Sequence, residues 1–104
     1  MTEDKRFEYH GYLDKIAGVD ITEVRAKDVS YGASWKKRGG VGAFFVMARK
    51  WDRLEEMVKK HDWNIFAAGE DTSGNDGTLL AEIRDLRRYL LLIEAEILHG
   101  KSQS

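Results

Sequence analysis

The chain has 104 residues, a length that suits one domain. Hydrophobic residues make up 42% and charged residues 34%, which is typical of a folded globular protein, and the absence of cysteine excludes disulfides, cysteine nucleophiles and thiolate metal sites. With 17 basic and 18 acidic residues the formal net charge is −1, which argues against bulk nucleic-acid binding and against a polybasic membrane anchor.

The first 40 residues predict two helices and a loop. We expect a helix over about residues 3–16, ended by Gly18. A second helix is expected over about residues 20–30, because Asp20 is a good N-cap. Residues 31–40 contain three glycines and a basic triplet without helical periodicity, which predicts a loop.

The rest of the chain predicts two long helices separated by a short one. A third helix is expected over about residues 41–60, with an apolar stripe that Met47 and Leu54 widen and that is formed by Val41, Phe44, Ala48, Trp51 and Val58. Residues 63–68 are expected to form a short helical turn and residues 69–77 a polar loop. The last helix should start at residue 76 or 78 and end near residue 99. It carries an apolar seam with alternating spacings of four and three residues, made of Leu79, Ile83, Leu86, Leu90, Ile93 and Ile97.

These elements predict an all-α fold, a single domain over residues 1–100 with a disordered tail at 101–104. The last helix has more apolar surface than one neighbouring helix can cover, so we expect a homo-oligomer, a dimer or larger. The chain has neither a long apolar run nor a signal peptide, and we therefore expect a cytoplasmic protein without membrane contact.

Four acidic residues form two pairs on helices. Asp52 and Glu55 are three residues apart in the third helix, and Glu82 and Asp85 are three apart in the last. Residues at that spacing share a helix face, so two antiparallel helices can bring all four carboxylates together. Such a cluster needs cations, and Mg²⁺ or Mn²⁺ would suit its oxygen ligands. The alternative is that all four are solvated charges.

A basic, glycine-rich segment precedes the third helix. Lys36, Lys37 and Arg38 are followed by Gly39 and Gly40, and then the helix begins. A helix N-terminus offers unpaired backbone N–H groups and the positive end of the helix dipole. The segment therefore predicts an anion site, with a flexible, solubilising surface loop as the alternative.

Aromatic residues and further cations accompany this segment. Tyr31 and Trp35 flank the basic triplet and could stack a nucleotide base, or Trp35 could simply pack beneath the loop. Lys50 and Arg53 are interleaved with the acids of the third helix. A metal-bridged phosphate site would need this arrangement, and ordinary salt bridges are the alternative.

The acidic pattern resembles a known signature. Asp52-x-x-Glu55, a spacer of 26 residues and Glu82-x-x-Asp85 are similar to the E-x-x-E and E-x-x-D motifs of the MazG-like all-α nucleoside triphosphate pyrophosphohydrolases. In small phage proteins near the nucleotide-modification-associated branch, a Tyr-Gly, a Lys-x-x-Arg and an Asp-x-x-x-Tyr recur. The matching residues here are Tyr31-Gly32, Lys50-x-x-Arg53 and Asp85-x-x-x-Tyr89.

The resemblance implies a four-to-five-helix MazG-like bundle that is oligomeric. It also implies Mg²⁺ held by Asp52, Glu55, Glu82 and Asp85, with Glu55 and Glu82 catalytic and Tyr89 among the substrate-binding residues. The first acid is an aspartate where the family usually has the longer glutamate.

Two functional hypotheses follow, and a third is weaker. The first is a phage-type hydrolase that cleaves a nucleoside triphosphate between the α and β phosphates. The second is a non-catalytic protein that sequesters a nucleotide, such as a cyclic messenger of host antiviral defence, in the host cytoplasm. The third is an oligomeric interaction protein without a ligand.

Overall fold

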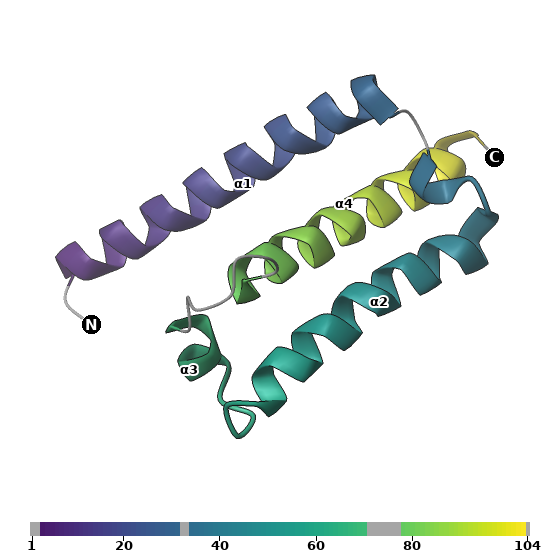
Figure 1. Cartoon of the computed structure of the whole chain (residues 1–104). Helices are drawn as coiled ribbons and strands as arrows, with labels where there is room; N and C mark the ends of the chain where they lie inside the picture. Colours follow the sequence, from purple (N-terminus) through teal and green to yellow (C-terminus); the bar gives the residue numbers. More distant parts are fainter. Residues whose placement is uncertain (1–2, 32–33, 71–77, 104) are drawn as a thin grey trace. The chain divides into compact units, whose positions relative to one another are not determined.

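The computed structural model describes the backbone of residues 3–31, 34–70 and 78–103, and the side chains of residues 5–27, 34–70 and 78–101. Within these ranges the secondary structure is entirely helical, which confirms the all-α class for the part described (Figure 1). The elements are α1 (Glu3–Tyr31), the 3-10 helix η1 (Ser34–Lys36), α2 (Gly39–Lys59), α3 (Ile65–Glu70) and α4 (Leu79–Gln103). The chain forms two compact units, residues 1–33 and 34–104.

Helix α1 forms the described part of the first unit. It is continuous, so the predicted end at Gly18 and the predicted second helix starting at Asp20 are wrong. A glycine inside a helix costs only about 1 kcal/mol relative to alanine, too little to end a helix of this length. The Thr22 hydroxyl also donates a hydrogen bond to the Gly18 carbonyl one turn earlier, with Oγ1 and O 3.0 Å apart. The apolar side chains of Tyr9, Leu13 and Ile16 in this helix are exposed.

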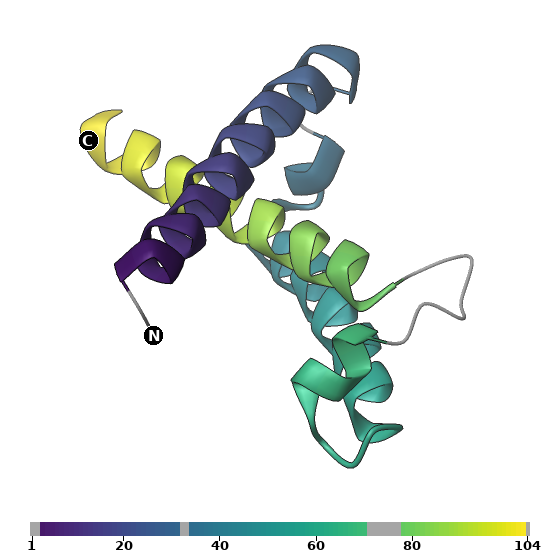
Figure 2. The same ribbon diagram turned by 90° about the vertical axis from the view of Figure 1, so that its left-hand side faces the viewer.

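The second unit is organised around α2 and α4, which pack antiparallel along much of their length (Figure 1). The 3-10 helix η1 packs on α2, and α3 contacts both long helices. Both views place α3 at the end where α2 finishes and α4 starts (Figures 1 and 2). No helix in the described ranges combines the length and apolar character that crossing a membrane requires.

The hydrophobic core lies at this same end of the unit. Its buried members are Leu54, Val58, Ala68 and Leu79, with Met57, Ile83 and Leu86 packed against them. The first three residues of the α4 seam are therefore covered as predicted, whereas Leu90 and Ile97 are exposed. The stripe predicted for α2 is confirmed in part, because Leu54 and Val58 are buried. Val41, Phe44 and Trp51 are exposed, and Ala43 is buried in their place.

Several predicted helix boundaries shift by a few residues. Helix α2 begins at Gly39, two residues before the predicted start, so two glycines expected in a loop are helical. Helix α3 extends to Glu70, and residues 71–77 of the predicted polar loop lie outside the described residues. Helix α4 continues to Gln103, past the predicted end near residue 99.

Local polar contacts set the starts of the two later helices. The Asn64 side chain accepts hydrogen bonds from the backbone N–H groups of Phe66 and Ala67, both at 3.1 Å, and so caps α3. The Thr78 hydroxyl accepts one from the Ala81 N–H at 3.2 Å and caps α4 in the same way. Serine, threonine, asparagine and aspartate serve this role because their side-chain oxygens reach the unpaired N–H groups of the first turn.

Candidate functional site

A cavity of about 620 Å³ lies at the end of the second unit opposite the core, where the N-terminus of α2 meets the C-terminal half of α4. This volume falls in the range of roughly 300–1,000 Å³ that is usual for small-molecule sites. The lining is mainly apolar and comes from η1, α2 and α4. It consists of Trp35, Lys36, Gly39, Gly40, Ala43, Phe44, Met47, Ile93, Glu96 and Ile97.

Glycines shape the backbone at the start of α2. Gly39 has a φ of +75°, in the left-handed region that residues with a Cβ rarely adopt. A Cβ added to Gly42 would lie 2.7 Å from the Cβ of Arg38, so the chain before the helix passes too close for any larger residue. A Cβ added to Gly40 would meet nothing within 4 Å, in keeping with the open space beside it. Gly39 and Gly42 therefore let η1 fold back against α2.

The start of α2 has no side-chain cap. Arg38 occupies the N-cap position and makes no capping hydrogen bond, and the first turn contains no acidic residue. The first N–H groups of a helix have no partner within the helix, and the helix dipole places partial positive charge there. This helix end, with the exposed side chains of Lys37 and Arg38 next to it, is electrostatically suited to an anion.

One ion pair lies at the cavity. The Lys36 Nζ donates to Oε2 of Glu96 at 2.6 Å, and the two side chains are 39% and 46% exposed. The hydrogen bond from Lys36 lowers the pKa of the Glu96 carboxyl below its usual value, so the carboxylate stays ionised at neutral pH. The cavity thus presents a cation and an anion side by side against an otherwise apolar lining.

The cavity brings together four of the binding residues predicted from the sequence. Trp35, Lys36, Gly39 and Gly40 line the cavity, and Trp35 is half-buried there. The side chain of Tyr31 lies outside the described residues.

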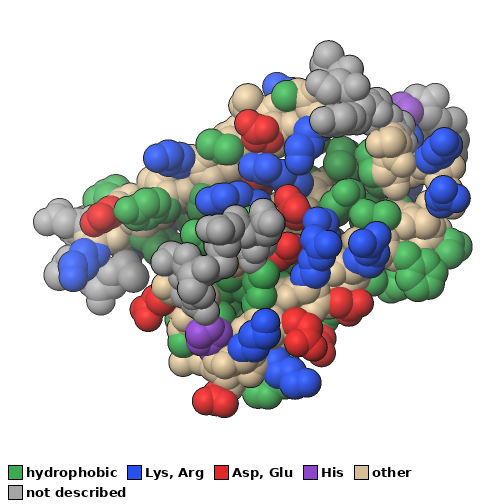
Figure 3. Space-filling view, viewed as in Figure 1, with side chains coloured by type: hydrophobic (Ala, Val, Ile, Leu, Met, Phe, Trp, Pro, Cys, Tyr) green, Lys and Arg blue, Asp and Glu red, His purple; other side chains and the backbone are tan. Residues whose placement is uncertain are grey.

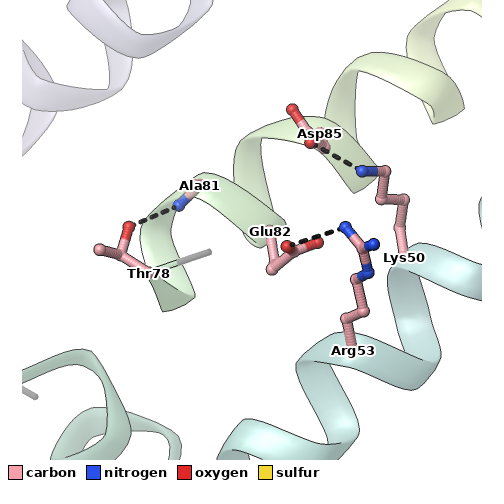
Figure 4. A network of polar contacts seen from close by, with 6 residues as sticks. All are labelled: Lys50, Arg53, Thr78, Ala81, Glu82 and Asp85. Carbon is pink, nitrogen blue, oxygen red and sulfur yellow. Dashed lines mark hydrogen bonds and ion pairs between the residues drawn. The ribbon is translucent and has the colours of Figure 1, made fainter. Parts of the chain in front are cut away.

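The other predicted cations pair with the acids of α4. Lys50 Nζ lies 3.0 Å from Oδ2 of Asp85, and Arg53 Nη1 lies 3.7 Å from Oε1 of Glu82. Figure 4 shows the two α2 side chains pointing across to the two α4 carboxylates. Basic and acidic side chains are correspondingly mixed over α2 and α4 in Figure 3. These are the cross-helix salt bridges that were the alternative to a phosphate site.

The four predicted metal ligands are not brought together. A helix turns by about 100° per residue, so Asp52 lies about 200° around α2 from Lys50, which faces α4. Asp52 and Glu55 are exposed, and the Glu55 carboxylate accepts a hydrogen bond from the Trp51 indole at 3.0 Å. Among the described residues no three histidine, aspartate or glutamate side chains form a group that could hold a metal ion.

Glu82 is nevertheless unusual. It is 4% exposed, and its Oε2 is buried with no hydrogen-bond partner among the described residues. A buried carboxylate oxygen without a partner costs on the order of 1–3 kcal/mol, more when the group is charged. Tyr89, the other predicted substrate contact on α4, is half-buried and does not line the cavity.

Sequence reasoning did not include Glu96 or the apolar lining of the cavity in the site. The register of α2 against α4 is the feature that could have identified Glu96. Once Lys50 is placed opposite Asp85, antiparallel packing puts Glu96 level with the start of α2. Charge complementarity with the basic triplet would then have pointed to Lys36.

Comparisons of this chain with known protein families, with curated proteins and with solved structures found no match.

Proposed function

We propose that this protein binds a nucleotide in the cavity beside the N-terminus of α2 and does not hydrolyse it. The observation that carries the proposal is the pairing of an apolar, tryptophan-containing cavity with an uncapped helix N-terminus and adjacent cations. A nucleobase has apolar faces that pack against Trp35 and Phe44, and its phosphate group carries the charge that the helix end favours. One small molecule therefore satisfies both halves of the site.

Binding without catalysis accounts for the acids better than hydrolysis does. Asp85 and Glu82 contact Lys50 and Arg53 rather than one another across a shared metal position. Glu55 is exposed and accepts a hydrogen bond from the Trp51 indole. None of these acids lines the cavity. A protein that only holds its ligand has no need of them at the binding site, and sequestration of a nucleotide, including a cyclic one, fits this arrangement.

Two adjacent phenylalanines provide a matched test. Phe44 lines the cavity and is 56% exposed, whereas Phe45 is 60% exposed and is not part of the lining. Calorimetric titration with a panel of nucleoside mono- and triphosphates and cyclic nucleotides, without added metal, should show that Phe44→Ala weakens binding about tenfold or more. Phe45→Ala should leave affinity within about twofold. Equal effects of the two substitutions, or no binding by the wild type, would contradict the proposal.

The cations provide a second test. Replacing Lys37 and Arg38, the exposed cations beside the start of α2, with alanine should weaken binding by about 1–3 kcal/mol, the range for charge-assisted contacts. The control is the double replacement of Lys59 and Lys60, which removes the same charge from the far end of α2. If both double variants lose the same affinity, the effect is one of overall charge, and the assignment of the anion to the start of α2 is wrong.

Magnesium-dependent pyrophosphohydrolysis is our second candidate, and the buried, unpartnered Oε2 of Glu82 is the observation that favours it. The likeness of the acidic pattern to the MazG-like signature supports the same candidate. Incubation of the protein with nucleoside triphosphates at millimolar Mg²⁺ or Mn²⁺ should then release pyrophosphate, at a rate that Glu82→Gln lowers about a hundredfold or more. Recovery of every nucleotide intact after heat denaturation would exclude this candidate and leave binding alone.

A further inference from the structure

The ion pair at the cavity has hydrogen-bonding capacity beyond its own contact. The Lys36 ammonium carries three donors, and one of them is directed at Oε2 of Glu96. An ionised carboxylate only accepts hydrogen bonds, and its two oxygens together accept about four. The pair therefore offers a ligand a donor beside a two-oxygen acceptor, and both residues belong to the cavity lining.

We infer that the Lys36–Glu96 pair reads the base of the bound nucleotide and makes the cavity selective for guanine. This inference rests on the proposed nucleotide binding. The Watson–Crick edge of guanine presents, in order, the O6 acceptor, the N1–H donor and the N2–H donors. The O6 atom accepts from Lys36, and the two donors reach the two oxygens of the Glu96 carboxylate in parallel. The ion pair stays intact, so the complex leaves no charged group without a partner.

Other purines match this pair less well. Adenine presents one donor and one acceptor on the same edge, so it gives the carboxylate a single hydrogen bond. Hypoxanthine retains O6 and N1–H but lacks the amino group at C2, and it also loses one hydrogen bond to Glu96. Each lost hydrogen bond to a charged group in a half-exposed site corresponds to about a tenfold loss of affinity.

The remaining contacts of the site do not distinguish the purines. The faces of guanine, adenine and hypoxanthine all pack against the apolar residues of the lining, and stacking on an aromatic side chain tolerates any base. The phosphate group at the start of α2 is the same in each nucleotide. The selectivity therefore depends on the edge of the base and on the one carboxylate that faces it.

The test is calorimetric titration of the wild type, Glu96→Gln and Glu94→Gln with GMP, IMP and AMP. Glu94 is exposed on the same helix and is not part of the cavity lining, so its variant controls for the lost charge. The wild type and Glu94→Gln should bind GMP about tenfold more tightly than IMP or AMP. In Glu96→Gln the amide has only one acceptor oxygen and its NH₂ group faces a donor of guanine, so the preference should fall to about twofold or less.

The outcomes separate this inference from the function on which it rests. Binding of GMP and AMP with equal affinity by the wild type would overturn guanine selectivity and leave nucleotide binding in place. A preference that survives in Glu96→Gln would overturn the role of the ion pair. A wild type that binds none of the three nucleotides, nor any other of the wider panel, would overturn both proposals.

Discussion

Replacing the glycines at the start of α2 one at a time distinguishes their effect on protein stability from their effect on nucleotide affinity. Gly39 is in the left-handed region with φ at +75°, and Gly40 is helical beside open space. An L-residue in the left-handed region costs about 1–2 kcal/mol, offset in part by about 0.4–1 kcal/mol from a less flexible unfolded chain. We expect Gly39→Ala to lower the free energy of unfolding by about 0.5–1 kcal/mol.

The neighbouring substitution should act in the opposite direction. Alanine in place of Gly40 meets no atom within 4 Å and gains about 0.5 kcal/mol from its better helix propensity. The two variants should therefore differ by about 1–1.5 kcal/mol, or about 4–12 °C in melting temperature for a domain of this size. Gly42→Ala should also destabilise, because its Cβ would lie 2.7 Å from the Cβ of Arg38.

Thermal unfolding followed by circular dichroism at 222 nm measures these differences, and nucleotide titration of the same variants adds a functional readout. Gly40→Ala should be the more stable of the two variants. Because Gly40 lines the cavity, its added methyl group should nevertheless make this variant bind nucleotide more weakly than wild type. Equal melting temperatures for Gly39→Ala and Gly40→Ala would refute the left-handed conformation at Gly39. Full nucleotide affinity in Gly40→Ala would contradict the position of the ligand.

Three further predictions concern the core, the ion pair and assembly. Leu54→Ala should destabilise by about 2–4 kcal/mol, because Leu54 is one of few buried core residues; a melting temperature within about 3 °C of wild type would contradict the core assignment. The lowered pKa of Glu96 means that the ion pair stabilises above the ordinary carboxyl pKa and that this stabilisation is lost as pH falls through the lowered value. Lys36→Ala should raise that pKa, as measured by carboxyl-carbon NMR, and an unchanged titration would count against the pair. The exposed apolar residues of α2 and α4 predict at least a dimer in light scattering at micromolar concentration, and a stable monomer would contradict this.

The spacing of apolar residues predicted helix faces correctly where tertiary packing and local helix propensity agree. The spacing of Leu79, Ile83 and Leu86 predicted the face of α4 that covers the core. The break predicted at Gly18 failed because a single glycine is a weak signal, and the preference of its helical neighbours outweighs it. The stripe predicted on α2 was wrong at Val41, Phe44 and Trp51 for another reason. Several apolar residues surround that helix, and only the position of α4 decides which of them are buried.

The basic, glycine-rich segment and the cluster of four acids differed in how much of their arrangement the sequence could predict. The basic, glycine-rich segment is local, so its cations and the helix start that they flank could be read directly from consecutive residues. The acidic cluster depended on the relative rotation of two helices, which residue spacing does not determine. Spacing placed Asp52 and Glu55 on one helix face, but that face does not point at Glu82 and Asp85. Glu96 was missed because its partner is 60 residues away.

The most direct measurement of the central claim is the fluorescence of Trp35 during a nucleotide titration. The chain has three tryptophans, and Trp51 and Trp63 are both exposed away from the cavity, so replacing these two with phenylalanine leaves a single reporter in the lining. Saturable quenching by GMP, with the midpoint that calorimetry gives, is the predicted result. The complementary Trp35→Phe protein should show no change. Heat of binding without any change in Trp35 emission would contradict the assignment of the nucleotide to this cavity.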